Sequence, residues 1–331
     1  MFPPGTPRPA RLPPRLRSGL SGNMTTESGM LCAAIDIGSN TTRLLVAEPG
    51  DGQLRKVMEQ RAYTRINKAI RDSGAIPSEK AHEVGEVVAT QVRLARELGA
   101  ETIRAVATAA VREASNGAAV AKQIGDDAGV PVEILSEQEE GRLSFIGATK
   151  TLGHPVDGLV GVVDVGGGSS EVILGTVQGG VREVRSWRVG SGVLADELIA
   201  SDPPSAAEIR KIRDRIDDLF AGVEIEQPTQ AVAVGGSATS LRRLVGAVLE
   251  YETLERGVRV LCSDPAADVA RRFELDPQRV RILATGVLLL EKLSELLGQP
   301  LQIGKGGLRE GVVLDQLNGN SNGSSPVRLA A

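Results

Sequence analysis

Two short stretches of the sequence share one pattern, and this repeat constrains the fold more than any other feature. Residues 33–46 read AAIDIGSNTTRLLV, and residues 162–174 read VVDVGGGSSEVIL. In each, an apolar strand ends at an aspartate, Asp36 or Asp164, and a turn of glycine and small polar residues leads into a second apolar strand. The two aspartates are 128 residues apart, about one domain length. The repeat predicts two domains that carry matching hairpins and face each other across a cleft.

Both turns are suited to bind phosphate. Glycine has no Cβ atom, so the backbone N–H groups of such a turn can approach an anion directly. For either stretch alone, a hairpin whose glycines only serve the turn is an alternative, but that alternative gives no reason for the pattern to recur. We therefore expect the two loops to bind phosphate through Gly38, Ser39, Asn40, Thr41, Gly166, Gly167, Gly168 and Ser169.

Composition argues against several other classes of protein. The net charge of −4 argues against a nucleic-acid-binding protein with a basic face. The two cysteines, Cys32 and Cys262, and the two histidines, His82 and His154, do not suggest a disulfide framework, a zinc site or a histidine-based triad. No apolar run is long enough for a membrane helix. A cytoplasmic protein without nucleic-acid or membrane partners is therefore expected.

The pattern of elements predicts two α/β domains with mixed sheets, because hairpins followed by alternating helical and extended patterns occur twice. We place domain I at residues 30–156 and domain II at residues 157–317, with the last helix packing back on domain I. Residues 1–29 are basic and rich in proline, and residues 318–331 are rich in glycine, serine and asparagine, so both ends are expected to be disordered.

A glutamate at the start of one helix is the candidate catalytic group. Ser136 and Glu139 have the spacing of a capping box, as do Ser205 and Glu208 at a second helix. If the box occupies Glu139, then Glu140 is left free one turn into the helix. If water attacks a phosphate bound at the loops, a nearby group must position or deprotonate that water, and we expect Glu140 to take this role. The alternative is that Glu140 only complements the helix dipole.

Arginines are expected to neutralise the phosphate oxygens. Arg43 follows the first loop, and Arg112 follows residues 102–111, whose apolar pattern predicts a buried strand. Both are expected to bind phosphate, because a guanidinium group can contact two phosphate oxygens at once. Arg104, inside that strand, is a further candidate, with a surface charge as an equal alternative.

A third glycine turn follows another strand. In VAVGGSATSL, residues 232–241, the strand leads into a helix through Gly235, Gly236 and Ser237. Helix N-termini attract anions, so we expect these three residues to bind phosphate. Contact with a guanosine, or a role limited to turning the chain, are the alternatives.

The sequence resembles the exopolyphosphatase/guanosine pentaphosphate phosphatase (Ppx/GppA) family of the actin-like ATPase superfamily. The similarity extends from about Ala33 to Leu314 and lies in six blocks in the family's order: AAIDIGSNTTRLLVA, RAVATAAVREASNG, EILSEQEEGRLSFIGA, VVDVGGGSSEVIL, VAVGGSATSL and GGLREGVVLD. The resemblance implies an α/β fold with two actin-like (ribonuclease H-like) domains, whose mixed sheets face a central cleft. It also implies that Arg309, in the last block, lies near this cleft.

The resemblance assigns roles to the acidic residues as well. Glu140 matches the family's catalytic base, and Asp36, Asp164 and Glu171 match the acids that hold Mg²⁺ (or Mn²⁺) or orient the water. Two departures from the family pattern are expected to alter the cleft or the hinge. Residues 64–70, TRINKAI, stand where an Arg-Leu-Gly segment is usual, and Arg281 replaces an acid.

Three functions compete on these observations. The favoured one is an exopolyphosphatase that releases terminal orthophosphate from inorganic polyphosphate by Mg²⁺-assisted attack of water. Short chains are expected as substrates, because the chain ends soon after Leu317, before a further domain could lengthen a channel. A homodimer that aligns two clefts would weaken that expectation. The alternatives are hydrolysis of guanosine pentaphosphate (pppGpp) to ppGpp, and a non-catalytic regulator that binds polyphosphate or nucleotide, against which Glu140 argues.

Overall fold

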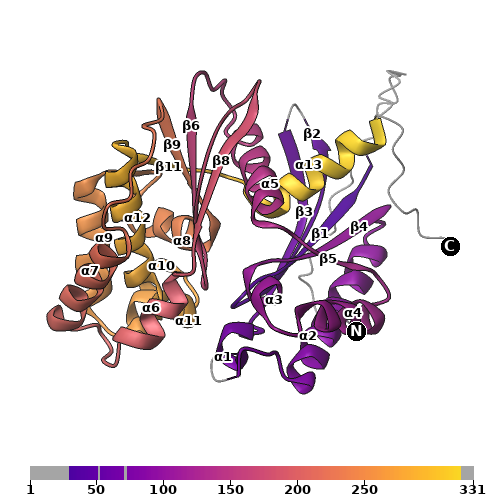
Figure 1. The fold of residues 1–331 in the computed structure, drawn as a ribbon, viewed down its shortest axis with the longest axis horizontal. Helices are drawn as coiled ribbons and strands as arrows, with labels where there is room; N and C mark the ends of the chain where they lie inside the picture. Colours follow the sequence, from indigo (N-terminus) through magenta and orange to yellow (C-terminus); the bar gives the residue numbers. More distant parts are fainter. Residues whose placement is uncertain (1–29, 51–52, 71–72, 322–331) are drawn as a thin grey trace, which may run out of the picture.

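The computed structural model describes residues 30–50, 53–70 and 73–321 (Figure 1). It contains two mixed β-sheets, one built from the first part of the chain and one from the second. The N-terminal segment expected to be disordered, residues 1–29, lies outside the described residues. The last helix extends to residue 321, so residues 318–321 do not belong to a disordered tail, and the rest of the predicted tail, residues 322–331, lies outside the described residues.

The first sheet has five strands in the order β3-β2-β1-β4-β5. Its first three strands form an antiparallel meander, and β4 and β5 run parallel to β1. Parallel neighbours need long crossovers, which here contain helices. The strands are β1 (Cys32–Ile37), β2 (Thr42–Gly50), β3 (Gln53–Ala62), β4 (Thr102–Ala107) and β5 (Val132–Ile134). The helices of this part are α1 (Ile66–Ile70), α2 (Ser78–Glu97), α3 (Ala109–Glu113), α4 (Gly117–Ala128) and α5 (Glu137–Lys150).

The second sheet has six strands in the order β10-β11-β9-β6-β7-β8. Strands β6, β7 and β8 again form an antiparallel meander, with β9 parallel to β6, as β4 is to β1. The strands are β6 (Val160–Val165), β7 (Ser170–Thr176), β8 (Gly180–Trp187), β9 (Gln230–Val234), β10 (Val248–Leu249) and β11 (Leu301–Ile303). The helices are α6 (Ser191–Leu198), α7 (Ala206–Leu219), α8 (Gly235–Val245), α9 (Tyr251–Ser263), α10 (Ala266–Phe273), α11 (Pro277–Arg281), α12 (Leu283–Leu297) and α13 (Leu308–Ser321).

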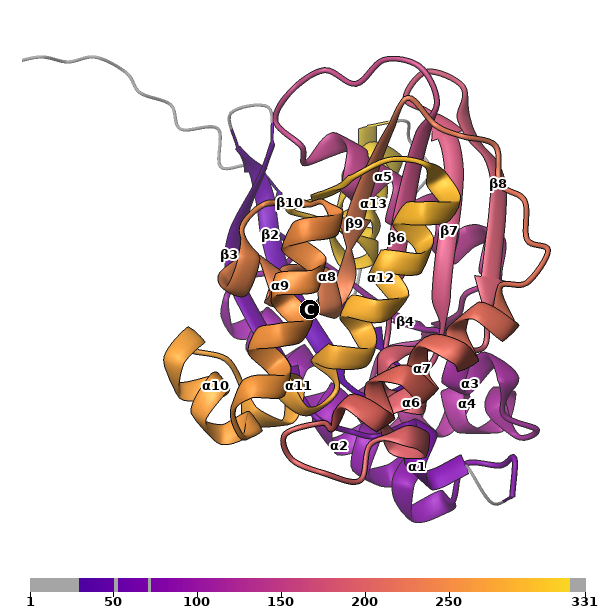
Figure 2. The ribbon, with the colours of Figure 1, turned by 90° about the vertical axis from the view of Figure 1, so that its left-hand side faces the viewer.

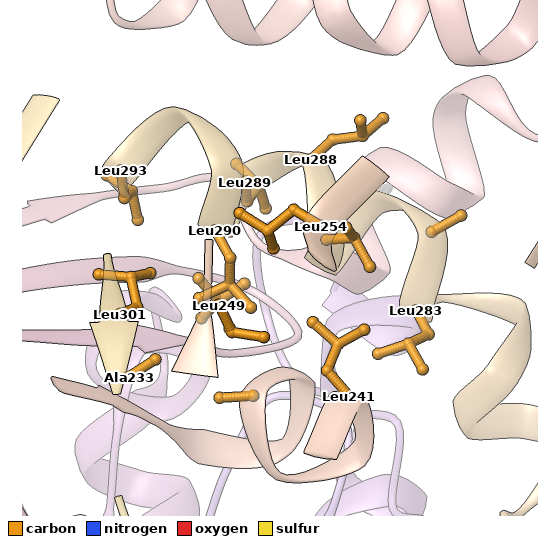
Figure 3. Close-up of a cluster of buried hydrophobic side chains, with 14 of the residues drawn as sticks. Ala233, Leu241, Leu249, Leu254, Leu283, Leu288, Leu289, Leu290, Leu293 and Leu301 are labelled. Carbon is orange, nitrogen blue, oxygen red and sulfur yellow. The ribbon is translucent and has the colours of Figure 1, made fainter. Parts of the chain in front are cut away.

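Alternating side chains of β1 supply two separate cores. Ala33 and Ile35 pack toward α2 and α4, whereas Cys32 and Ala34 pack toward α5 and α13, as the two-residue period of a strand requires. The second sheet is buried mainly against α12, which is apolar on nearly all sides and so lies in the interior. Figure 3 shows leucines of this helix, such as Leu289, among side chains from α8, α9 and β11.

Helices α5 and α13 lie between the two sheets (Figure 1). They cross so closely that a Cβ atom on Gly147 would lie 1.9 Å from the carbonyl oxygen of Gly307, and one on Gly311 would lie 1.8 Å from that of Leu143. Glycine is therefore required where the two helices cross. Helix α13 also contacts β1 of the first sheet. The boundary between residues 156 and 157 stays a prediction.

Within the described ranges, no helix is both long enough and apolar enough to cross a membrane.

Candidate active site

The two glycine loops have the same backbone geometry. In the first, the N–H of Gly38 donates to the carbonyl of Thr41 (3.1 Å); in the second, the N–H of Gly166 donates to the carbonyl of Ser169 (3.0 Å). A Cβ atom on either glycine would lie 3.2 Å from that carbonyl oxygen. The repeat in the sequence is therefore also a repeat in the structure.

The tips of the two loops touch each other across the cleft. A Cβ atom on Gly167 would lie 3.1 Å from the Cβ of Asn40, and one on Gly168 would lie 2.6 Å from the hydroxyl oxygen of Ser39. Because these glycines have no side chains, the opposite loop can approach them closely. The sequence pattern did not reveal this role.

A cavity of about 490 Å³ adjoins both loops, which is the size of a typical small-molecule site. We call it the catalytic cavity. It brings together nearly all residues that the sequence pattern singled out. Those that line it are Asp36, Gly38, Ser39, Asn40, Thr41, Arg43, Glu140, Asp164, Gly166, Gly167, Gly168, Ser169, Glu171, Gly235 and Gly236.

Strand pairing places the acidic side chains at the loops. Asp36 lies opposite Arg43 in the β1–β2 pair, and Asp164 lies opposite Glu171 in the β6–β7 pair. The carboxylate of Asp164 also contacts the third glycine turn, where a Cβ atom on Gly235 would lie 2.1 Å from Oδ1. Gly235 has φ +80°, a backbone conformation that favours glycine, so both geometry and space require glycine here.

Burial raises the pKa values of these carboxylates. The pKa of Asp36 is raised by burial, and that of Asp164 is raised to about 6 by burial and then by the charge of Asp36. Burial, followed by repulsion from Glu140, raises the pKa of Glu171 well above its usual range. Like charges held together in a buried site favour a bound cation.

The acidic side chains at the loops supply only part of a metal-binding site. In the described ranges, no three or more His, Cys, Asp or Glu side chains form a group that could hold a metal, so the expected set of Asp36, Asp164 and Glu171 is not a ready-made three-ligand site. Glu171 instead accepts a hydrogen bond from the Ser186 hydroxyl (3.2 Å). Mg²⁺ commonly binds one or two carboxylates and completes its shell with water and substrate phosphate. The oxygen donors of Asp36 and Asp164, which face the same cavity, fit that mode.

Glu140 lies in the first turn of α5 and faces the catalytic cavity. Its Oε2 accepts a hydrogen bond from Arg112 Nη1 (2.7 Å), and the same nitrogen donates to the carbonyl of Leu135 (2.9 Å). Burial raises the pKa of Glu140 to about 7, while the pairing with Arg112 opposes that rise. A carboxylate with a pKa near neutrality is suited to general-base catalysis.

The capping-box argument that singled out Glu140 is only half right. The Ser136 side chain accepts the N–H of Glu139 (3.2 Å), but the Glu139 carboxylate does not return the bond and is paired with Arg142 (2.8 Å). Glu139 is therefore occupied, though by a different partner. The capping box of Ser205 with its glutamate is complete, as predicted.

Two of the predicted cations do not line the catalytic cavity. The strand expected over residues 102–111 ends at Ala107, so Arg112 lies on helix α3 and its guanidinium is engaged by Glu140. Arg104 is paired with Glu133 (2.9 Å) and with Asp315 of α13 (2.8 Å). Arg104 therefore joins the first sheet to the last helix.

Ser237 is also absent from the cavity wall. Its side chain is fully buried, and its hydroxyl donates to the carbonyl of Val165 (3.0 Å), just before the second loop. Its hydroxyl is therefore not available to bind phosphate in the catalytic cavity. The hydroxyl supports the second loop from behind.

The structure adds cations that the sequence pattern did not assign to the site. These added cations are Lys56, Arg61, Arg243, Arg279 and Lys305. Arg309, which the family resemblance placed near the cleft, also lines the catalytic cavity. Arg61 reaches the site because it lies opposite Arg43 in the β2–β3 pair. Burial, followed by the charges of Arg309 and Arg61, lowers the pKa of Arg43 to about 9. This mutual repulsion favours an anionic ligand.

Arg279 is the most buried of these added cations, with 7% of its surface exposed. Its guanidinium lies against the N-terminus of α8, since a Cβ atom on Gly236 would lie 2.8 Å from Nη2. Its Nε finds no hydrogen-bond partner in the part of the chain that the structure describes. Arg279 comes from α11, and no local sequence pattern connects that helix to the third glycine turn.

Comparison with solved structures supports the expected architecture. The crystal structure of an Aquifex aeolicus member of the Ppx/GppA family matches with a TM-score of 0.74 and 27% identity, over 88% of this chain and 98% of the other. An exopolyphosphatase structure from Cytophaga hutchinsonii, at 20% identity, shares the fold with a TM-score of 0.77, over 88% of this chain and 98% of the other. The prediction of an actin-like α/β fold with two mixed sheets is confirmed.

Sequence comparison gives the same relationship. Exopolyphosphatase 1 of Mycobacterium leprae is 27% identical over 319 residues, which are 91% of this chain and 94% of the relative. Exopolyphosphatase 2 of Mycobacterium tuberculosis is 27% identical over 308 residues, 86% of this chain and 96% of the relative. The model of the Ppx/GppA phosphatase family matches residues 45–320. The chain therefore belongs to the Ppx/GppA phosphatase family.

Proposed function

We propose that this protein is an exopolyphosphatase, which releases terminal orthophosphate from inorganic polyphosphate and acts on short chains. The observation that carries the proposal is the meeting of two matching glycine loops with Glu140 in one cavity. Family membership and the named exopolyphosphatases among the relatives support the same reaction.

The terminal phosphate binds between the two loops. Backbone N–H groups of the loops donate to its oxygens, as glycine-rich turns do in other phosphate sites. Arg43 of the first sheet and Arg309 of α13 neutralise these oxygens, and Arg61 and Arg279 bind phosphates farther along the substrate chain. Guanidinium groups suit this role because they contact two oxygens at once.

Glu140 accepts the proton of the attacking water. Its raised pKa keeps it a strong enough base near neutral pH, and its bond to Arg112 fixes the carboxylate in one orientation. Positioning and charge neutralisation supply most of the rate acceleration in phosphoryl transfer. Glu140 therefore needs only to hold its carboxylate in the right orientation toward the water.

Asp36 and Asp164 would hold Mg²⁺ or Mn²⁺ together with the phosphate oxygens. When bound, the metal ion supplies charge neutralisation at the phosphate oxygens. Glu171 stays close by, where its hydrogen bond to Ser186 orients it toward the site.

Phosphate release from polyphosphates of defined length, measured beside release from pppGpp, tests the proposal. We expect polyphosphate to give the higher kcat/KM. A clear preference for pppGpp would make the chain a pppGpp 5′-phosphohydrolase instead. No release from either substrate in the presence of Mg²⁺ or Mn²⁺ would favour the non-catalytic regulator.

A further inference from the structure

The first glycine loop is held from behind by backbone N–H groups of a segment that follows β3. The carbonyl oxygen of Ser39 accepts a hydrogen bond from the N–H of Asn67 (3.0 Å), and that of Asn40 accepts one from the N–H of Arg65 (3.0 Å). We call Arg65, Ile66 and Asn67 the first brace. Arg65 directly precedes α1, and the other two residues begin this helix.

The second glycine loop is held in the same way. The carbonyl oxygen of Gly166 accepts the N–H of Ser191 (2.9 Å), and that of Gly167 accepts the N–H groups of Gly192 (3.0 Å) and Val193 (3.1 Å). We call these three donors, which begin α6, the second brace. Helices α1 and α6 lie at the same end of the molecule in both views (Figures 1 and 2). The repeat of the loops therefore extends to their supports.

The braces fix the direction of the peptide units in the loops. In a planar trans peptide, the C=O of one residue and the N–H of the next residue point in opposite directions. Because the braces hold the loop carbonyls, the N–H groups that follow them are directed to the other side of each loop. These N–H groups belong to Asn40, Thr41, Gly167 and Gly168, all of which line the catalytic cavity.

The first brace lies on the far side of the loops from the catalytic cavity. A second cavity, of about 650 Å³, is also lined by Asn40, Gly167 and Gly168, so the touching loops form part of the wall between the two cavities. Arg65 and Asn67 line the second cavity and not the catalytic one. This placement agrees with loops whose carbonyls face the brace and whose N–H groups face the phosphate site.

Arg65 has an unusual backbone conformation, in which its own N–H and that of Asn67 both reach the loop. Its φ is +49°, in the left-handed region that few residues other than glycine and asparagine adopt. Its neighbours are anchored on both sides. The hydroxyl groups of Thr64 and Thr42 are hydrogen-bonded to each other (3.1 Å), and Ile66 is fully buried in the core of the first sheet. Such strain persists only where the surrounding structure enforces it, and it occurs preferentially at functional sites.

The side chain of Arg65 has a different role from its backbone. It is exposed and donates a hydrogen bond across the cleft to the side chain of Gln278 on α11. Water competes for such an exposed bond, so its net contribution is small. Since Arg65 does not line the catalytic cavity, its guanidinium is not placed as a phosphate ligand there. The backbone conformation is therefore the feature of Arg65 that connects it to the phosphate site.

We propose that Arg65 is a positioning residue for phosphate binding, whose left-handed backbone holds the first loop so that the N–H groups of Asn40 and Thr41 are directed at the phosphate. The inference rests on the proposed function, because it takes a phosphate between the loops as the ligand. The left-handed region is open to glycine, is tolerated by asparagine and is strained for a β-branched residue. Substitutions at residue 65 therefore separate its backbone from its charge.

Calorimetric titration with inorganic triphosphate and Mg²⁺, in a Glu140→Gln parent protein, tests the proposal without rapid turnover. Arg65→Gly and Arg65→Asn should bind within about twofold of the parent, because both keep the turn. Arg65→Val should bind about five- to tenfold more weakly, because valine makes the braced turn less populated and the ligand must restore it. Lys68→Val is the matched control, since it replaces another basic residue of the same segment that lies outside the left-handed region.

Hydrogen exchange and unfolding separate positioning from a general loss of stability. In Arg65→Val, the amides of Arg65 and Asn67 should exchange faster than in Arg65→Gly, while the amides of β1 exchange as in the parent. Urea unfolding shows whether Arg65→Val is fully folded at the titration temperature. If it is not, Arg65→Ala replaces it, because an unbranched Cβ is disfavoured in the same conformation to a smaller extent.

Equal losses of affinity in the glycine, asparagine and valine variants would assign the role to the guanidinium and overturn the proposal. Unchanged affinity in Arg65→Val, with faster exchange at the brace, would also overturn it. So would a loss in Gln278→Ala as large as that in Arg65→Val, because the bridge between side chains would then be the cause. If triphosphate does not bind even the parent, the proposed function itself fails and this inference fails with it.

Discussion

Glu140 experiences two opposing influences, and their balance determines when it can act as a base. Burial raises its pKa to about 7, and Arg112 holds it lower than burial alone would. A general base must be deprotonated, so kcat/KM should rise with pH through about 7. In Arg112→Met this rise should move to higher pH, which a pH–rate profile measures. Arg142→Met, which unpairs the neighbouring Glu139, is the control and should leave the midpoint in place.

Replacing the glutamate itself should separate binding from turnover. Glu140→Gln keeps the size of the side chain but cannot accept a proton, so turnover should fall by about 10²- to 10⁴-fold while substrate binding is retained. Steady-state phosphate release and a direct binding measurement check this. Glu139→Gln, one position earlier and outside the cavity wall, should stay close to the wild-type rate. Near-normal turnover in Glu140→Gln would remove it from the mechanism.

At the scale of single elements, local patterns predicted the parts of the site that local geometry builds. The hairpins that carry Asp36 and Asp164 were predicted because strand alternation and glycine turns are local properties. The sequence predicts Arg112 directly after a strand over residues 102–111, because apolar residues continue past Ala107, where the backbone turns into α3. Arg279 could not be predicted, since only tertiary packing brings α11 against Gly236.

The packing of Gly190 behind the second loop makes a prediction at this scale. A Cβ atom on Gly190 would lie 2.5 Å from the backbone of Gly167, which cannot move aside without displacing the second loop. Because displaced catalytic groups cost large factors in rate, Gly190→Ala should lower kcat/KM by about 10- to 100-fold. Gly319→Ala, with open space around the new methyl group, is the control. Wild-type kinetics in Gly190→Ala would show that the loop position is not critical.

At the scale of the whole molecule, the buried carboxylates link stability to pH. The pKa values of Asp164 and Glu140 are raised in the folded state to about 6 and about 7. The folded protein therefore binds protons more tightly than the unfolded chain, and stability should fall as pH rises from about 4 to 7. Urea unfolding in EDTA at several pH values measures this fall.

Substitution and metal ion should both reduce that dependence on pH. Asp164→Asn removes one titrating group, whereas Asp214→Asn, at an exposed position, should change nothing. Mg²⁺ should raise the unfolding midpoint most at pH 7 and above, where the carboxylates are charged, because it binds the folded state. Stability that is independent of both pH and Mg²⁺ would argue against a cation at Asp36 and Asp164.

The charge distribution around the catalytic cavity predicts how the enzyme handles a long substrate. Polyphosphate carries about one charge per phosphate, so a processive enzyme needs a long path of unpaired cations. Here the cavity has a volume of about 490 Å³, and its added cations lie among acidic side chains, with Glu274 beside Arg243 and Asp276 near Arg279. Such a site binds only a few phosphate units at a time.

We therefore expect distributive cleavage, in which the chain is released after each phosphate is removed. A time course on polyphosphate of several hundred units, resolved by gel electrophoresis, should show the whole population shortening together. Affinity should also fall only gently with salt, because few counterions are displaced on binding. If full-length chains persist beside free phosphate, the enzyme is processive. A dimer that joins two cavities would then be the first explanation to test, by measuring mass in solution with polyphosphate present.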